Sequence, residues 1–219
     1  MQFDIGGNPH YGDLTVSLGS GESLWTEAGA MSRMSTHLQL QSRLPGGFMQ
    51  AAIRKLVGGE SLFVSEYTAD TSGMISVSPA SPGSVLQREL TGDSLLLTAG
   101  AFLACTPGLS LQPRFGGLRS FFSGEGVVLM EASGEGHLFF NAFGGVIEKE
   151  VEGALTVDTG HVVAWEPTLE YRIKGMGGLK QTLFSGEGLV MEFTGRGRIW
   201  LQTRHVSALA GWLTPYCRG

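Results

Sequence analysis

The amino-acid sequence predicts an all-β protein made of three tandem β-sandwich units related by pseudo-threefold symmetry. Two phrases recur along its 219 residues, and its 34 glycines are more than twice the roughly 7% of average usage. The glycines separate short apolar runs, as short strands joined by tight turns require. A repeat on the order of 60 residues indicates one structural unit used several times, and units that small are expected to share a core.

The first repeated phrase is a glycine–glutamate turn followed by an apolar strand. Its copies occupy residues 57–66 (VGGESLFVSE), 123–131 (SGEGVVLME) and 185–192 (SGEGLVME). Corresponding glycines are 65 residues apart for Gly59 and Gly124, and 62 residues apart for Gly124 and Gly186. A continuous apolar run of this kind is typical of a strand buried on both faces.

The second repeated phrase opens each unit with a turn and another apolar run. Its copies occupy residues 21–30 (GESLWTEAGA), 92–101 (GDSLLLTAGA) and, in diverged form, 160–167. An earlier strand is predicted at 14–18, 85–90 and 153–157, where Leu14, Val16 and Leu18 alternate with polar residues. Turns at 70–73, 133–136 and 194–197 lead to closing strands at 74–77, 137–140 and 198–201. Each unit is therefore expected to hold five or six short antiparallel strands.

These phrases divide the chain into residues 1–80, 81–145 and 146–219, the last including a C-terminal tail. Unit one carries about four extra residues after its glycine pair, judged from the repeat spacing. The segment 48–56 there has good helix formers and no proline or glycine, which predicts one short helix. Residues 208–213 are expected to form a helical turn that caps unit three.

Composition narrows the classes of function. Charged residues make up 16% of the chain, against roughly 25% in typical domains, and the mean hydropathy is +0.10. An apolar surface marks an interface, so we expect self-association. The net charge of −5 argues against nucleic-acid binding. The start of the chain lacks signal-peptide features and no apolar run approaches a membrane span, so a cytoplasmic location is expected.

Six repeated glutamates are the candidate site residues. Three lie in the glycine turns and three at the far end of the following strand: Glu60, Glu125 and Glu187, then Glu66, Glu131 and Glu192. A carboxylate on an apolar strand is costly unless it is paired or hydrogen-bonded, so one interpretation gives each glutamate a turn amide, lysine or arginine as partner. The alternative is that the repetition builds a polar ring, forming a channel or a cation site.

Signatures of catalysis or of a transition-metal site are absent from the sequence. The five histidines form no HxH or HxxxH pair, and the chain contains no GxSxG motif. Cys105 and Cys217 belong to no CxxC motif. Arg196 and Arg198 have no basic counterparts in the other units, which indicates a solvated turn. We therefore predict no catalytic residue, no metal ligand and no cofactor.

Taken together, the phrases resemble the altered-inheritance-of-mitochondria family, whose bacterial members were long catalogued as a conserved domain of unknown function. The resemblance covers residues 3–206 and is carried by segments 21–24, 28–30, 57–63, 95–104 and 183–192. It implies tandem triplication of a unit similar to the subunit of the tryptophan RNA-binding attenuation protein, a short double-stranded β-helix. It also implies a trimer of chains, with nine units in a ring. The RNA-contacting basic residues of the attenuation protein have no counterpart here.

These observations favour a non-enzymatic homotrimeric ring that acts as a binding or scaffolding module for an unknown protein partner or small ligand. A ring that binds a ligand or nucleic acid is the first alternative. An enzyme of cupin-like shape is the second.

Overall fold

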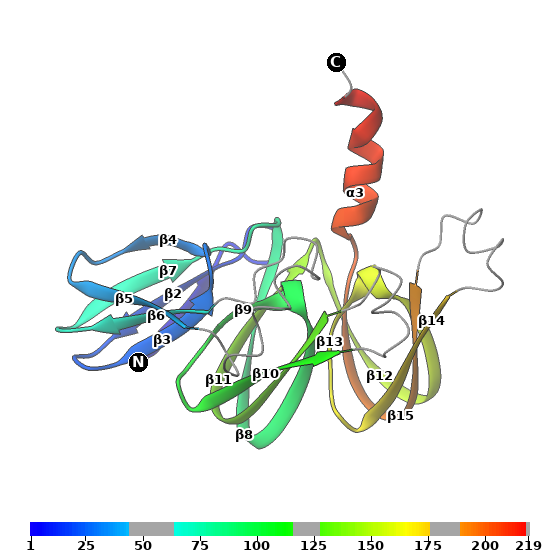
Figure 1. The fold of residues 1–219 in the computed structure, drawn as a ribbon, viewed down its shortest axis with the longest axis horizontal. Helices are drawn as coiled ribbons and strands as arrows, with labels where there is room; N and C mark the ends of the chain where they lie inside the picture. The colour runs from blue at the N-terminus through cyan, green and yellow to red at the C-terminus, as the bar shows by residue number, and fades with distance from the viewer. Residues whose placement is uncertain (44–63, 116–127, 176–188, 218–219) are drawn as a thin grey trace.

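A computed structural model describes residues 1–43, 64–115, 128–175 and 189–217. The described chain is predominantly antiparallel β-structure, which confirms the all-β prediction. Figure 1 shows its strands gathered in three groups along the longest axis, with one helix standing above the row. The predicted helix at 48–56 and the glycine–glutamate turns lie outside the described residues.

The first group of strands comes from the N-terminal part of the chain. It consists of β1 (Gln2–Gly6), β2 (Asp13–Leu18), β3 (Ser23–Glu27), β4 (Met31–Met34), β5 (Leu38–Arg43), β6 (Val64–Ala69) and β7 (Gly73–Val77). A four-stranded sheet in the order β1-β2-β7-β4 belongs entirely to this group. Strand β2 alternates buried and more exposed residues, as the period-two pattern of residues 14–18 predicts.

The second and third groups contain longer strands. They consist of β8 (Gly83–Thr98), β9 (Phe102–Cys105), β10 (Leu109–Phe115) and β11 (Val128–Phe143), followed by β12 (Val146–Asp158), β13 (Val162–Trp165), β14 (Leu169–Gly175) and β15 (Leu189–Gln202). A 3-10 turn precedes β9 and another precedes β13: η3 (Ala99–Ala101) and η4 (Thr159–His161). The order turn, four-residue strand, seven-residue strand and long strand thus occurs twice.

One eleven-stranded sheet links all three groups. Its path is β12-β15-β13-β8-β11-β9-β3-β6-β5, with β10 paired to β11 and β14 paired to β15. Two pairings cross between groups, and we name them the first joint (β3 with β9) and the second joint (β8 with β13). The joints bury apolar side chains, so the core is continuous: the central cluster combines Val64 of β6 with Trp200 of β15.

The turns predicted at 133–136 and 194–197 are wrong, because β11 and β15 continue through both segments. In β11 the register shifts between Ser133 and Glu135, which marks a β-bulge. Gly134 in that bulge has φ +117°, a conformation that side chains disfavour. The pairing of β11 with β8 continues on both sides of this shift. The second and third groups consequently have four strands each, fewer and mostly longer than predicted, whereas the first group has seven short strands.

One side-chain hydrogen bond is repeated in the three groups. In each, a side-chain oxygen just after the four-residue strand accepts from a backbone N–H near the start of the closing strand segment. The acceptor and donor residues are Ser35 and Met74 (3.0 Å), Thr106 and His137 (2.9 Å), and Glu166 and Arg198 (3.0 Å). A glycine precedes each donor, and at Gly136 a Cβ would collide with the Thr106 hydroxyl. The repeated glycines at these positions therefore serve close packing.

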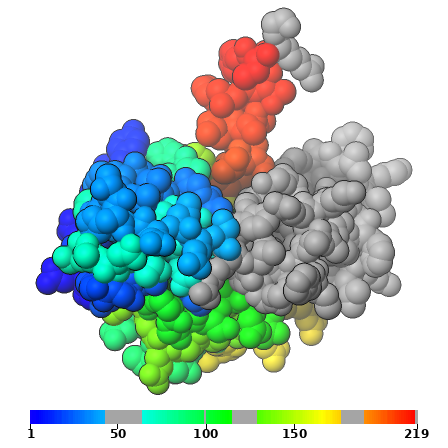
Figure 2. Space-filling view, turned by 60° about the vertical axis from the view of Figure 1, so that its left-hand side comes forward, coloured from blue at the N-terminus to red at the C-terminus, as the bar shows by residue number. Residues whose placement is uncertain are grey.

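Helix α3 (Val206–Leu213) follows β15. His205 caps it, because its ring nitrogen accepts from the backbone N–H of Ala208 at 3.3 Å. The prediction that the tail caps unit three is wrong, since no residue of α3 is buried. Helix α3 projects away from the strands in Figures 1 and 2. It is also far too short to cross a bilayer, and the described residues include no longer apolar helix that could do so.

Candidate functional site

The three strand glutamates occupy the same place in the sheet. Glu66 lies opposite Trp25 of β3, Glu131 opposite Leu96 of β8, and Glu192 opposite Thr156 of β12. On the other side they face Gln41, Gln112 and Arg172. The sequence repeat around these glutamates therefore corresponds to a repeat of backbone register.

Each of these carboxylates has a polar partner within the chain. Glu66 is only 8% exposed and accepts a hydrogen bond from the indole nitrogen of Trp25 at 3.1 Å. The other two form cross-strand ion pairs, Glu131 with Arg114 (Nε to Oε2, 2.7 Å) and Glu192 with Lys174 (Nζ to Oε1, 3.1 Å). These contacts are those expected if the carboxylates stabilise the sheet.

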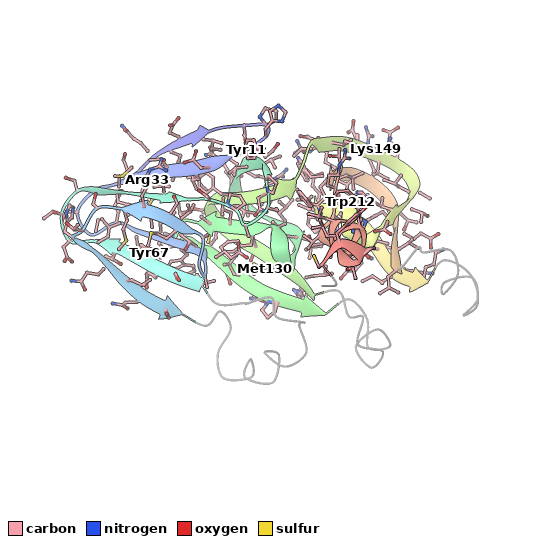
Figure 3. All side chains as sticks on the ribbon, turned by 90° about the horizontal axis from the view of Figure 1, so that it is seen from above. Tyr11, Arg33, Tyr67, Met130, Lys149 and Trp212 are labelled. Carbon is pink, nitrogen blue, oxygen red and sulfur yellow. The ribbon has the colours of Figure 1, made fainter. Side chains whose placement is uncertain are left out.

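A single chain does not bring the three glutamates together. They lie on β6, β11 and β15, which are not neighbours in the sheet. Figure 3 shows two of the three strands apart from each other: it labels Tyr67, which follows Glu66 on β6, and Met130, which precedes Glu131 on β11. Within the described ranges, no group of three or more histidine, cysteine or acidic side chains could hold a metal ion. Glu60, Glu125 and Glu187 lie outside the described residues, so the polar ring stays a prediction.

A network of charged groups that sequence reasoning missed lies at the second joint. Glu166, just after β13, accepts from Arg198 Nε at 2.9 Å and from Arg88 Nη1 at 3.2 Å. Both guanidinium groups lie over the ring of Trp200, each 5.5 Å from its centroid. Arg88 also contacts Asp93 at 3.1 Å. The network ties β8 to the third strand group through ion pairs and cation–π contacts.

The network also fixes the charge of its carboxylates. Burial by itself would raise the pKa of Glu166, but the backbone N–H and guanidinium of Arg198, together with the charge of Arg88, lower it below its ordinary value. Burial likewise opposes ionisation of Asp93, while the N–H of Thr91 and the Arg88 guanidinium bring its pKa below the usual range. Both groups are therefore anions near neutral pH and hold the arginines in place.

Sequence reasoning missed this network because its members are far apart in the chain. Arg88 and Glu166 are separated by 78 residues, and no local motif links them. Arg198 lies in strand β15 and not in a turn, and its exposed side chain pairs with Glu166. One signal was available: a glutamate at position 166 replaces the hydroxyl residues Ser35 and Thr106 of the other units. A carboxylate at that place can bind an arginine as well as the backbone N–H.

The C-terminal segment is a second surface feature. Its large apolar side chains are between 39% and 75% exposed: Val206, Leu209, Trp212, Leu213 and Tyr216. Segment 206–217 contains no Asp, Glu, Lys or Arg. In Figure 2 this helix, in red, stands clear of the β-structure. An apolar surface of this kind is typical of interaction sites.

Comparison with known proteins places the chain in a family. Residues 3–204 match the family model described as mitochondrial biogenesis AIM24. The chain belongs to the AIM24 family. An uncharacterized protein of Streptococcus pyogenes serotype M6, M6_Spy0233, is 30% identical over 225 residues, which cover 99% of this chain and 91% of that protein. The family predicted from the repeated phrases is thereby confirmed.

A solved structure supports the same assignment. The X-ray crystal structure of protein SPYM3_0169 from Streptococcus pyogenes is similar with a TM-score of 0.84 and 30% sequence identity. The match covers 98% of this chain and 99% of that one. The fold described above is therefore shared over essentially the whole length of both proteins.

Proposed function

We propose that this AIM24-family protein is a non-enzymatic scaffold: three identical chains, each a tandem triplication, assemble into a homotrimeric ring that serves as a binding module. The triplication is supported by the recurring element order, the equivalent register of the three glutamates and the repeated hydrogen bond at the start of each closing segment. The low charged fraction of 16% supports association of the chains.

The exposed helix α3 is the observation that carries this proposal. It is eight residues long, and isolated helices shorter than roughly 12 residues are marginal in water. Helices of this length gain their stability by packing an apolar face, yet no residue of α3 is buried in the chain. A second copy of the protein would supply the missing contact, and Trp212 and Tyr216 are the residue types that dominate interfaces.

Light scattering coupled to size-exclusion chromatography tests the proposal directly. The expected mass is three times the 23.3 kDa of the chain. The double substitution Leu209→Ser with Trp212→Ser should shift the protein toward smaller species, because it removes two exposed apolar anchors. Tyr11→Ser is the matched control, since Tyr11 is 77% exposed but lies far from α3 in the sequence and apart from Trp212 in Figure 3. A full-length chain that is monomeric at micromolar concentration would refute the homotrimer.

The two alternatives predicted from the sequence remain open to cheap tests. Filter binding across a salt series would detect a nucleic-acid ring, because phosphate contacts make affinity fall steeply with salt. Metal analysis of the purified protein tests for a cupin-like enzyme, because a stoichiometric transition metal would favour that alternative. Within the described ranges, we find no feature that favours either alternative over a scaffold.

A further inference from the structure

Both joints within the chain use the same strand pairing. At the first joint Trp25 and Thr26 of β3 lie opposite Cys105 and Ala104 of β9. At the second, the end of β8 meets β13 in the same antiparallel register, with Leu96 opposite Trp165 and Leu97 opposite Ala164. The rule is therefore simple: the strand facing the glutamate in one unit pairs with the four-residue strand of the next.

The four-residue strands differ according to whether a preceding unit exists. Strands β9 and β13 are buried at every residue, because each is paired on both sides. Strand β4 takes the same place in unit one, since Met34 faces Ile75 as Cys105 faces Leu138. Yet β4 pairs only with β7 among the described strands, and its residues 31–33 are exposed. No described strand occupies its outer edge.

The opposite end of the chain has the complementary edge. The last residues of β12 take the place of β3 and of the end of β8, because Thr156 faces Glu192 as Trp25 faces Glu66. Leu24 and Leu95 are fully buried at their joints, whereas the corresponding Leu155 is only half-buried. Within the described sheet β12 pairs with β15 alone. Among the described strands, β4 and β12 thus each have an unpaired edge, and the two edges match each other.

We propose that β4 of one copy pairs with the end of β12 of the next copy, extending the pairing of the two internal joints from chain to chain. Continuing their register places Met34 opposite Thr156 and Arg33 opposite Val157, in antiparallel orientation. The contact joins two different surfaces, so it is heterologous and forms a closed ring when the rotation per copy permits. This inference rests on the proposed homotrimer and names the residues of its interface.

The side chains at the open edges suit an interface whose strands are exposed to water in the separate chain. The apolar joint residues Leu103 and Phe139 of unit two are replaced in unit one by Ser32 and Ser76, by the register of β4 on β7. A polar residue such as Ser32 on the edge strand β4 limits nonspecific pairing of the separate chain. Backbone hydrogen bonds would then hold the joint, as in other cases where a strand is added to a sheet edge.

Charge and position add to the match between the two edges. Strand β4 carries Arg33, which pairs with Asp13 of its own chain yet is more than half exposed, and β12 ends at Asp158, next to the predicted position opposite Arg33. Opposite charges across an interface favour one partner orientation. Helix α3 begins beside the same edge, since a Cβ on Gly160 would come within 3.1 Å of Asp158 and 2.9 Å of His205. An incoming copy on β12 would therefore reach the base of the uncovered helix.

Disulfide trapping tests the register. In a Cys217→Ser background, where the remaining Cys105 is buried, chains with Met34→Cys are mixed with chains with Thr156→Cys and oxidised. The expected product is a mixed disulfide dimer on a non-reducing gel, and the double variant should give covalent trimers. Ser32→Cys mixed with Thr156→Cys is the control, because it is two residues out of register and should cross-link at least several-fold less.

The outcomes separate this inference from the proposed function. A trimer by light scattering that forms no Met34–Thr156 cross-link overturns the strand pairing and leaves the homotrimer standing. Efficient Met34–Met34 cross-linking in the single variant also overturns it, because that product requires an isologous contact. A monomer refutes the homotrimer and the pairing together. The circular dichroism spectrum of each single-cysteine variant serves as a control. A spectrum unchanged from that of the wild type shows that the substitution leaves the fold intact.

Discussion

The two joints within the chain share a backbone pairing but differ in their side chains. At the first joint Phe139 is fully buried and contacts Phe3, with ring centroids 5.0 Å apart. At the second joint the equivalent residue is Trp200, which lies under two arginines held by Glu166. Strand register thus recurs while the chemistry that seals each joint is free to change, from an apolar contact to a charged network.

The largest expected effect comes from breaking the apolar joint. Phe139→Ala should lower the free energy of unfolding by about 3–5 kcal/mol, because it leaves a cavity beside Phe3 and the core of the first group. Urea unfolding followed by circular dichroism measures the change. Tyr11→Ala, an aromatic truncation at an exposed site, should cost far less. Equal losses for the two variants would show that Phe139 does not seal the joint.

Breaking the charged joint should lower the free energy of unfolding by a smaller amount. Glu166→Gln should lower the free energy of unfolding by about 2 kcal/mol, since it leaves the half-buried guanidinium of Arg88 with a weaker partner. The matched control is Glu152→Gln, whose ion pair with Arg196 is exposed on both sides and should contribute no more than about 1 kcal/mol. The idea fails if both variants unfold at the same urea concentration.

Acid should weaken the second joint selectively. The folded-state pKa of Glu166 lies below its ordinary value of 4.5, so its contribution is fully present above that pH. The contribution is lost as the pH falls through the lowered folded-state pKa, where the carboxylate takes up a proton. Glu166→Gln should therefore flatten the acid limb of a stability–pH curve, while Phe139→Leu should leave its slope unchanged. Parallel acid limbs for the wild type and Glu166→Gln would contradict this account.

The smallest expected effect concerns the repeated hydrogen bond at the start of the closing segments. Thr106→Val removes the hydroxyl that accepts from the backbone N–H of His137, at a cost of about 1 kcal/mol. Ser35→Ala should have a similar effect in unit one through Met74. Thermal unfolding of both variants beside Glu166→Gln would rank the three equivalent positions. A loss for Thr106→Val as large as that for Glu166→Gln would show that the added arginine contacts contribute nothing.

Sequence reasoning worked where the signal was local or repeated. The alternation of Leu14, Val16 and Leu18 predicted β2, and the repeated phrases predicted the family and the all-β class. It failed where distant strands decide the outcome. The glycines of β11 and β15 resemble turn residues, but the neighbouring strands keep both segments paired. The partners of Glu131 and Glu192 were expected to be basic residues, yet only cross-strand register identifies Arg114 and Lys174.

The sequence by itself determined the family, the all-β class and the repeated positions, because these follow from local propensity and from residues that recur at a regular spacing. Only the tertiary structure decided which strands pair across the joints, how Arg88 reaches Glu166, and that α3 stays uncovered. The physical reason is that pairing and burial depend on residues tens of positions apart, whose approach leaves no pattern in the chain. The same reason makes the two open edges, β4 and β12, visible only once the internal joints are known.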